Sequence, residues 1–401
     1  MSRAPIESVE LERVIAPFGE SRTLPAAGYA SEAVFAWELD NIFKSTWFCV
    51  GRSDELIGPG QIRAVDVVGE SVLLTRDAEG ALRAFSNVCR HRGHELVAEG
   101  EALGAHLIRC PYHSWSYRLD GELRAAPTFA QTPGFDKSEF PLVPIAVSEY
   151  LGWAWVDLSG AARPLAEHFG NLAEKAAPYE TDRLTAGATH SYMVDANWKI
   201  VVENYNECYH CSSIHPELCE VTPPDSGLDH QPTGVWCGGT MRLKDHAVTM
   251  SLDGASKGVN FRQIEGDGAR EVWYVTMMPN LLLSMHPDYV MTHRLTPLTA
   301  GRTHVECTWL FPPEAFDLVG FDPAYAVDFW DITNREDWEA CEKVMKGVRQ
   351  LGYRQGPLSS WEGTVYQFLV MIGNLYLGRG LVVPEVPTRK LSESGSGHLD
   401  T

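Results

Sequence analysis

The chain has 401 residues, 44% of them apolar, and its 33 basic and 53 acidic residues give a net charge of −20. This length and apolar content predict two or three domains, each with a core of its own. The acidic excess disfavours nucleic acids and anionic membrane surfaces as partners, because both are polyanions. The N-terminal residues have no apolar signal segment, and no apolar run approaches the about 18 to 20 residues of a membrane span, so we expect a cytoplasmic protein.

The character of the chain changes near residue 45. Residues 1–44 place apolar side chains at helical spacing, as in SEAVFAWELDNIFKSTW, which predicts a helical segment. In residues 45–165, short alternating runs are broken by Gly and Asp-Gly turns, which is typical of a small antiparallel β domain. The stretches DAEGALRAF and RLDGELRAAP are expected to be hairpins of this domain.

Residues 166–388 are predicted to form a larger domain that mixes helices and strands, so the fold class is α+β. The stretch ANWKIVVENYNECYHC is expected to be one helix, and REVWYVTMMPNLLLSMH and RTHVECTWLF are expected to contain strands. Two further helices are predicted at NREDWEACEKVMKGVRQ and WEGTVYQFLVMIGNLYLG. The polar, Gly- and Ser-rich residues 389–401 predict a disordered tail.

Two short stretches, CRHRGHEL and CPYHSW, each pair one cysteine with one histidine. Cys89 and His91 lie two residues apart, and Cys110 and His113 lie three apart. Two thiolates and two imidazoles on neighbouring loops could hold zinc or a Rieske 2Fe–2S cluster, in which two Cys bind one iron and two His the other. Zinc fingers usually pair Cys with Cys and His with His, so the mixed pairs favour the cluster.

This two-part motif resembles the Rieske family. The resemblance implies that Cys89 and Cys110 bind the buried iron of a 2Fe–2S cluster, and that His91 and His113 bind the outer iron. Residues 45–165 would then be the Rieske domain.

The stretch ENYNECYHCSSIHPE gathers acids and histidines further along the chain. On a helix Glu207 and His210 would share a face, whereas His215 could join them only if the helix ends. Pro216 disfavours helical backbone at His215, so the chain can turn there and bring His215 back towards His210. Two imidazoles with one carboxylate from elsewhere would form the facial triad of non-haem Fe(II) oxygenases.

With Asn-Trp-Lys before it and Glu-Asn at its start, this stretch resembles Rieske non-haem iron oxygenase α subunits over about residues 40–380. The resemblance implies that His210 and His215 bind the mononuclear iron. It also implies that Glu207 bridges His210 to a Rieske histidine of a neighbouring subunit in a homotrimer. Residues 166–388 would be a helix-grip catalytic domain of the StAR-related lipid-transfer type, with a curved antiparallel sheet and a long C-terminal helix. Residues 1–44 would pack on this domain.

The third iron ligand must come from a distant segment, and FWDITNREDWEACEKV is the best candidate. Thr333 and Glu336 fit a capping box, so a helix is expected to begin near Asn334 with Asp337 in its first turn. The family places its late Asp in a comparable Glu-Asp-Trp setting. We therefore predict Asp337 as the third ligand, with Asp331 as the alternative.

Nine cysteines, an odd number spread unevenly over a long chain, argue against a disulfide framework. Cys208 and Cys211 form a Cys-x-x-Cys pair, but nothing around them suggests a redox protein of the thioredoxin type. We expect both to be packing side chains.

The predicted activity is that of a Rieske monooxygenase or dioxygenase that uses O2. No clear GxGxxG follows a strand, so electrons are expected from a separate NAD(P)H-dependent reductase. The phrases ENYNECYHC, HPEL and TNREDWEACE are most similar to the subgroup that demethylates quaternary ammonium compounds such as betaines and releases formaldehyde. Aromatic side chains that could surround the ammonium group, each of which also fits a core position, are Tyr205, Tyr209, Trp236, Tyr289, Trp309 and Trp330.

Two other functions remain open from the sequence. An aromatic ring hydroxylase or aryl O-demethylase would use the same iron centres with an apolar pocket. An iron–sulfur electron carrier without oxygenase activity would need only the first cluster, and the His210, His215 and Asp337 set argues against it.

Overall fold

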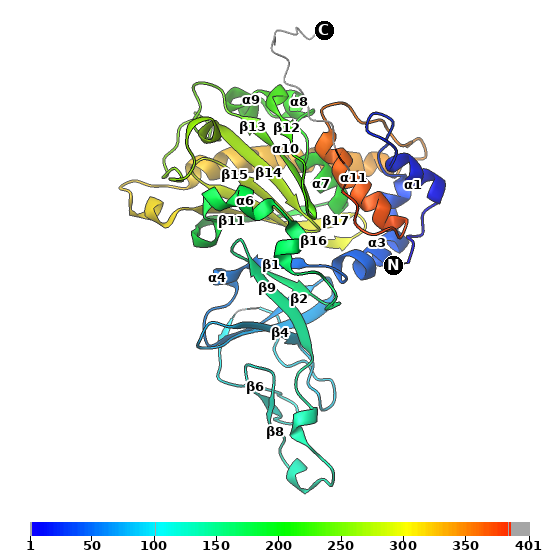
Figure 1. The fold of residues 1–401 in the computed structure, drawn as a ribbon, viewed down its shortest axis with the longest axis vertical. Helices are drawn as coiled ribbons and strands as arrows, with labels where there is room; N and C mark the ends of the chain where they lie inside the picture. The colour runs from blue at the N-terminus through cyan, green and yellow to red at the C-terminus, as the bar shows by residue number, and fades with distance from the viewer. Residues whose placement is uncertain (1, 101, 384, 386–401) are drawn as a thin grey trace. The chain divides into compact units, whose positions relative to one another are not determined.

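The computed structural model describes residues 2–100, 102–383 and 385, and the predicted tail 389–401 lies outside this part. The chain folds into two compact units (Figure 1). The first, which we call the β unit, comprises the described residues of 35–169 and 181–183. The second, the mixed unit, comprises the described residues of 1–34, 170–180 and 184–401. The domain boundaries expected from the sequence stay a prediction.

The β unit is built on a seven-stranded antiparallel sheet with the order β1-β10-β9-β4-β3-β2-β5, and β6, β7 and β8 form a separate three-stranded sheet. Its strands are β1 (Phe48–Arg52), β2 (Gln61–Val67), β3 (Glu70–Arg76), β4 (Leu82–Ser86), β5 (Leu103–Gly104), β6 (Ile108–Arg109), β7 (Ser116–Tyr117), β8 (Leu123–Ala125), β9 (Pro144–Tyr150) and β10 (Trp153–Asp157). Both predicted hairpins are confirmed, as β3–β4 and β7–β8.

The core of the β unit joins its two sheets. Phe85 of β4 packs in one cluster with Trp115 and with Tyr117 of β7. The turn between β7 and β8 approaches this core closely at Gly121, which has φ +88° and where a Cβ would lie 2.4 Å from a ring carbon of Phe85. Only glycine meets both demands without strain. The helical segments of the unit are η1 (Leu39–Phe43), α4 (Ser53–Leu56), η2 (Phe129–Gln131), η3 (Lys137–Glu139), α5 (Leu165–Phe169) and η5 (Thr181–Arg183).

The mixed unit is built on a second seven-stranded antiparallel sheet, with the order β11-β17-β16-β15-β14-β13-β12. Its strands are β11 (Thr185–Val194), β12 (Leu228–Asp229), β13 (Trp236–Arg242), β14 (Glu271–Met277), β15 (Leu281–Met285), β16 (Val290–Thr299) and β17 (Arg302–Phe311). The long helix α10 (Ala324–Val348) contacts β11 and α7 (Trp198–Tyr205), and α7 contacts β16 (Figure 1). The predicted α+β class, with a curved antiparallel sheet and a long helix near the C-terminus, is confirmed.

The other helices of the mixed unit are short, apart from α11. They are α1 (Ser8–Val14), α2 (Ala26–Ala30), α6 (Leu172–Ala176), η4 (Ala177–Tyr179), α8 (Cys211–Ile214), α9 (Pro216–Val221), η6 (Pro224–Ser226), η7 (Gly266–Arg270), η8 (Pro313–Asp317) and α11 (Gly363–Tyr376), while α3 (Glu32–Glu38) crosses from this unit into the β unit. Helix α11 contacts α1 and β13. No helix in the described ranges is long and apolar enough to cross a bilayer.

Two predicted helix bounds are wrong. The expected helix through Cys211 ends at Tyr205, and a turn separates it from α8. The helix expected to begin near Asn334 begins ten residues earlier, at Ala324, whose backbone N–H is capped by Asp322. Thr333 is therefore not an N-cap, and its hydroxyl instead donates to the carbonyl of Phe329 one turn earlier. Apolar side chains that precede Thr333 continue the buried face of the helix, and they outweigh the local capping pattern.

Candidate metal centres and substrate pocket

The first cysteine–histidine pair of the β unit lies in a tight turn after β4. The backbone N–H of Gly93 donates to the carbonyl of Cys89, and the N–H of Cys89 donates to the carbonyl of His94. The Cys89 thiol is buried and lies 3.3 Å from the hydroxyl of Tyr117, which also accepts from the N–H of Arg90. Tyr117 therefore fixes the position of this turn and of its thiol.

The second pair lies in a matching turn before β7. The N–H of Ser114 donates to the carbonyl of Cys110, and the N–H of Cys110 donates to the carbonyl of Trp115. Ser114 takes a positive φ of 61°, which closes the turn after His113. Trp115 stacks on the ring of His91 with centroids 5.0 Å apart. The turn thus places its histidine beside the histidine of the first pair.

These four side chains fit a 2Fe–2S cluster. The rings of His91 and His113 are 4.7 Å apart, and each has a buried Nδ1 without a hydrogen-bond partner among the described residues. Cys89 and Cys110 are both free, buried thiols. Burial raises the pKa of the Cys89 thiol, and the neighbouring Cys110 adds to the rise. Two free thiols and two unpartnered imidazole nitrogens are the donor set that a Rieske cluster needs.

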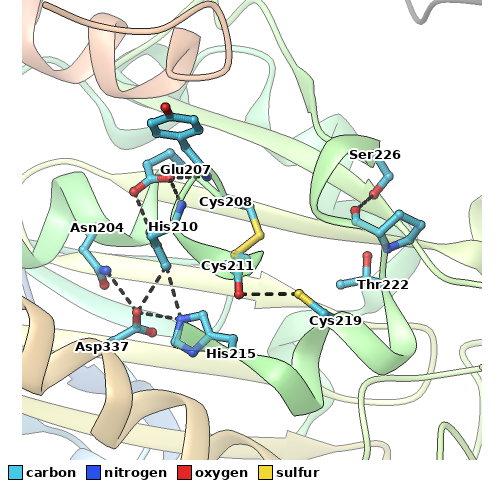
Figure 2. The surroundings of a disulfide bond; sticks show 12 residues. Asn204, Glu207, Cys208, His210, Cys211, His215, Cys219, Thr222, Ser226 and Asp337 are labelled. Atoms are coloured by element: carbon cyan, nitrogen blue, oxygen red, sulfur yellow. Dashed lines mark hydrogen bonds and ion pairs between the residues drawn. A yellow bond between two sulfur atoms is a disulfide. The ribbon is translucent and has the colours of Figure 1, made fainter. Parts of the chain in front are cut away.

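The second centre is built on the turn that follows α7 in the mixed unit. Asn197 caps α7 by accepting from the N–H of Lys199, and the helix ends at Tyr205. Glu207 then organises the turn, since its carboxylate accepts from the backbone N–H groups of Tyr209 and His210. The same carboxylate lies 2.5 Å from Nδ1 of His210. This contact fixes the imidazole so that Nε2 points away from Glu207 (Figure 2).

His210, His215 and Asp337 converge on one point (Figure 2). Nε2 of His210 is 3.2 Å from Nε2 of His215, and Oδ1 of Asp337 is 3.4 Å from the first and 3.0 Å from the second. Two ligands bound at right angles with bonds of about 2.1 Å lie about 3 Å apart. The three atoms therefore fit one face of a metal's coordination sphere, and they leave the opposite face open. The sequence expectation that Pro216 lets the chain turn at His215 agrees with α9 beginning at this proline.

The electrostatics of the three side chains also suit a cation. Burial favours neutral His210, but hydrogen bonds with Asp337 and Glu207 outweigh it and raise its pKa to about 10. Burial would also lower the pKa of His215. Its interaction with Asp337 outweighs burial and raises that pKa above the usual value. Asp337 is buried, yet its hydrogen bonds with the two histidines hold its pKa well below the usual range. A divalent cation would replace the protons that this arrangement otherwise holds on the imidazoles.

Two further residues, which the sequence offered only as parts of local motifs and not as members of the site, position these side chains. Nδ1 of His215 lies 2.8 Å from Oε2 of Glu336, the residue directly before Asp337. The side-chain amide of Asn204 donates to Oδ1 of Asp337 at 2.9 Å. Glu207 and Glu336 thus each hold one imidazole by its Nδ1, which is how carboxylates commonly orient metal-binding histidines.

The alternative carboxylate, Asp331, faces a different set of partners. Its oxygens accept from the hydroxyl of Tyr192 at 2.6 Å and from Nε of Arg335 at 2.8 Å. It also lies 3.3 Å from Nδ1 of His190. Asp331 is therefore not part of the cluster formed by the two histidines and Asp337.

The expectation that Cys208 and Cys211 are separate packing side chains is wrong, because the structure joins them in a disulfide. Their Cα atoms are 4.9 Å apart, and the disulfide closes a short loop that contains His210 (Figure 2). On a continuous helix the two thiols would lie one turn apart, but the turn after α7 brings them within bonding distance.

A pocket in the mixed unit opens directly onto the three converging side chains. Its aromatic wall consists of Tyr205, Tyr274, Trp330, Trp338 and Trp361. Two of these, Tyr205 and Trp330, are among the aromatic residues that the sequence offered. The other four candidates do not line it: Trp236, Tyr289 and Trp309 are fully buried, and Tyr209 is exposed.

Comparison with known proteins places both centres in one family. Residues 46–137 match the Rieske [2Fe-2S] domain, and residues 181–376 match the catalytic domain of the ring hydroxylating alpha subunit. The carnitine monooxygenase oxygenase subunit of Escherichia coli (strain K12) is 36% identical over 343 residues, which cover 84% of this chain and 86% of that protein. The chain belongs to the Rieske oxygenase α subunits. It is therefore an enzyme, and the alternative of an electron carrier without oxygenase activity is set aside.

The names of other relatives of this oxygenase also refer to quaternary ammonium compounds. The glycine betaine monooxygenase oxygenase subunit of Chromohalobacter salexigens is 30% identical over 391 residues, covering 89% of this chain and 86% of that protein. The quaternary ammonium Rieske monooxygenase CntA in complex with L-carnitine has a TM-score of 0.75 and 25% identity, and the match covers 94% of this chain and 100% of that one. The helix-grip fold, the 2Fe–2S cluster and the mononuclear non-haem iron expected from the sequence are those of this family.

Proposed function

We propose that this oxygenase removes an N-methyl group from a quaternary ammonium compound, the class to which betaines belong. The observation that carries the proposal is an aromatic-walled pocket that opens onto His210, His215 and Asp337. Aromatic faces attract a trimethylammonium group through cation–π contacts, whereas they offer no anchor for an anionic substrate. The relatives that act on glycine betaine and carnitine support the same substrate class.

Different residues of the chain would bind the cluster, the mononuclear iron and the substrate. Cys89, His91, Cys110 and His113 would hold the cluster, and His210, His215 and Asp337 would hold the iron, which supplies O2 activation when bound. Three protein ligands on one face leave room for O2 and for a substrate methyl group on the other. The pocket walls hold the ammonium group close to this open face and exclude water from it.

The reaction balances with two electrons and two protons for each O2. One oxygen atom enters a C–H bond of the N-methyl group, and the other leaves as water. The resulting N-hydroxymethyl compound loses its hydroxyl proton and formaldehyde, and the C–N bonding pair stays on nitrogen, which leaves a tertiary amine. Electrons would come from NAD(P)H through a separate reductase.

Glu207 is proposed as the electron-transfer bridge between His210 and the Rieske histidines of a neighbouring subunit in a homotrimer. Its contact with Nδ1 of His210 at 2.5 Å supports the first half of this role. The name of one structural relative refers to inter-subunit electron transfer in that protein.

The cytoplasm is the proposed location of the enzyme. Residues 45–165 are the proposed Rieske domain, and residues 166–388 are the proposed catalytic domain.

The test is a substrate screen with the iron-loaded enzyme, a compatible NAD(P)H reductase and O2. Quaternary ammonium compounds, aromatic acids and aryl methyl ethers are compared by formaldehyde release and by hydroxylated products. We expect formaldehyde in step with O2 use only from N-methyl ammonium compounds. Turnover of aromatic rings or aryl ethers, with none from ammonium compounds, would refute the proposal and favour the ring hydroxylase or O-demethylase alternative.

A further inference from the structure

The loop that carries His210 is closed by a covalent bond as well as by hydrogen bonds. Cys208 and Cys211 lie on either side of His210, and their disulfide joins the two ends of residues 208–211 (Figure 2). Within this loop the backbone N–H of Cys211 donates to the carbonyl of Cys208 at 3.2 Å, and the carboxylate of Glu207 accepts from the N–H of His210. The disulfide therefore restrains the backbone on both sides of a candidate metal ligand.

Packing against the rest of the mixed unit restrains this loop only in part. Cys211 is buried, whereas Tyr209 is 60% exposed and Cys208 and His210 are half-buried. Helix α8, which follows directly, has only four residues. Segments with few buried contacts open locally at a low cost in free energy. We therefore expect the disulfide to contribute to keeping the imidazole of His210 in place.

The disulfide can be reached from the substrate pocket. Cys208 and Cys211 both line that pocket, and Cys208 is the more exposed of the two. A disulfide is reduced when a thiolate attacks one of its sulfur atoms, so the rate depends on access to that sulfur. Cys208 is therefore the side of the bond at which a small thiol would attack.

The proposed cytoplasmic location favours a reversible bond over a permanent one. Cytoplasmic thiols reduce most protein disulfides, and the pairs that do form there are usually catalytic or sense the redox state. The Cys-x-x-Cys spacing of Cys208 and Cys211 is typical of pairs that exchange between dithiol and disulfide. Because this pair is placed around His210, a change in its redox state acts directly on the metal centre.

We propose that the Cys208–Cys211 disulfide is a redox switch of the mononuclear iron site. The oxidised pair holds His210 in its metal-binding position, and reduction of the pair lowers the affinity of the site for Fe(II). This inference rests on the proposed assignment of His210, His215 and Asp337 as the iron ligands, and it adds a form of regulation to that site.

A dithiol carries out the reduction in two exchange steps. One of its thiolates attacks Sγ of Cys208, the S–S bond breaks, and the bonding electron pair leaves with Sγ of Cys211, which takes up a proton. The second thiolate of the reductant then attacks the sulfur that the first has attached to Cys208. This closes a disulfide within the reductant and releases Cys208, which is protonated in turn. The protein pair gains two electrons and two protons, and the dithiol loses them.

Fe(II) titration of the enzyme in two redox states tests the switch. Both samples retain the cluster and have lost the mononuclear iron; one stays oxidised, and the other is treated anaerobically with dithiothreitol, which is removed before the titration. Alkylation of denatured samples reports whether the pair is reduced. After reduction we expect two more alkylated cysteines and an affinity for Fe(II) about tenfold lower, with the visible absorption of the cluster unchanged. Oxidised glutathione should restore both values.

The possible results separate the switch from the metal centre itself. A pair that resists dithiothreitol in the folded enzyme, or an equal affinity in both states, would overturn the inference and leave the metal centre standing. An affinity that stays low after the disulfide has formed again would also overturn it. Absence of mononuclear iron binding in both states would instead reject the assignment of the three ligands, and with it the proposed function.

Two variants distinguish the disulfide from other effects of the dithiol. Cys208→Ser with Cys211→Ser cannot form the bond, so we expect it to bind Fe(II) like the reduced enzyme, with or without dithiothreitol. The control is Cys219→Ser, which removes a free, half-buried thiol that donates to the carbonyl of Cys211 at 3.4 Å, and it should respond as the enzyme does. A response that persists in the double variant, or that is lost in Cys219→Ser, would assign the effect to other thiols and contradict the proposal.

Discussion

Glu336 holds His215 from behind, with Nδ1 of the imidazole 2.8 Å from Oε2 of the carboxylate, while Nε2 of the same ring lies 3.0 Å from Oδ1 of Asp337. Two adjacent residues of α10 therefore have different tasks: Glu336 orients a histidine, and Asp337 joins it in the metal centre. Glu207, in the turn after α7, orients His210 through Nδ1 in the way that Glu336 orients His215.

The first prediction concerns Glu336→Ala. Without its partner at Nδ1, His215 can rotate and change tautomer, so we expect the affinity of the mononuclear site for Fe(II) to fall about 10- to 100-fold. Glu336→Gln should lose less, because the amide oxygen can still accept from Nδ1. Fe(II) titration of protein that retains the cluster measures this effect. The control is Glu339→Ala, an exposed residue of the same helix that pairs with Lys343; equal affinities in all three variants would contradict the role of Glu336.

The second prediction separates the two candidate carboxylates. Asp337→Asn should lose the mononuclear iron and keep the visible absorption of the cluster, because a neutral amide is a weak ligand for Fe(II). Asp331→Asn should keep both iron centres, since Asp331 is bound by Tyr192 and Arg335 instead. Metal analysis of the two variants distinguishes them, and loss of iron from Asp331→Asn alone would show that the assignment is reversed.

The third prediction concerns the disulfide. Native protein denatured without reductant should have seven of its nine cysteines alkylated once the metals are removed, because Cys208 and Cys211 are joined. Closing so short a loop stabilises the folded chain by about 2 kcal/mol in the chain-entropy account. Cys208→Ser with Cys211→Ser should lose up to this much of the free energy of unfolding, measured in urea. Nine alkylated cysteines would show that the pair is reduced.

The fourth prediction is a loss of stability in acid. Burial lowers the pKa of His286 to about 3, and that of His168, His230 and His293 to about 4, below an unfolded value of about 6.5. The unfolded chain therefore binds more protons below pH 6.5, so the contribution of these groups is complete above pH 6.5 and is lost as the pH falls towards 4.

The variant His286→Phe removes one of the four histidines that bind a proton in the unfolded chain. It keeps a ring that can stack on Tyr289. Between pH 7.5 and 5.5 the enzyme should lose about 1.4 kcal/mol of unfolding free energy for each such histidine. We therefore expect the loss in His286→Phe to be smaller by about that amount, as measured by urea denaturation at the two pH values. The same loss in both proteins would mean that His286 is not kept neutral by the fold.

The sequence predicted those features whose residues all lie within one short stretch of the chain. Cys89 with His91 and Cys110 with His113 lie in turns of a few residues, and their spacing alone predicted the side chains that the fold brings together. Pro216 similarly marked the turn at His215. The hairpins β3–β4 and β7–β8 were predicted because each has its turn residues between two alternating runs.

Hydrogen bonds between residues that are distant in the sequence could not be predicted in this way. Glu336 orients His215 across 121 residues, and Thr364 orients Asp229 across 135. Neither pair has a spacing pattern, because only the packing of α10 and α11 brings them together. The capping pattern at Thr333 misled for a related reason: it is a local signal inside a helix whose length is set by its buried face.

The central claim is that two separate iron centres form on one chain, and iron content tests it most directly. Metal analysis and visible absorption are measured for the enzyme and for His210→Ala after identical anaerobic reconstitution with iron and sulfide. We predict about three irons per chain in the enzyme, and about two in His210→Ala with the absorption of the cluster unchanged. Zinc without visible absorption in the enzyme, or three irons retained in His210→Ala, would contradict the account.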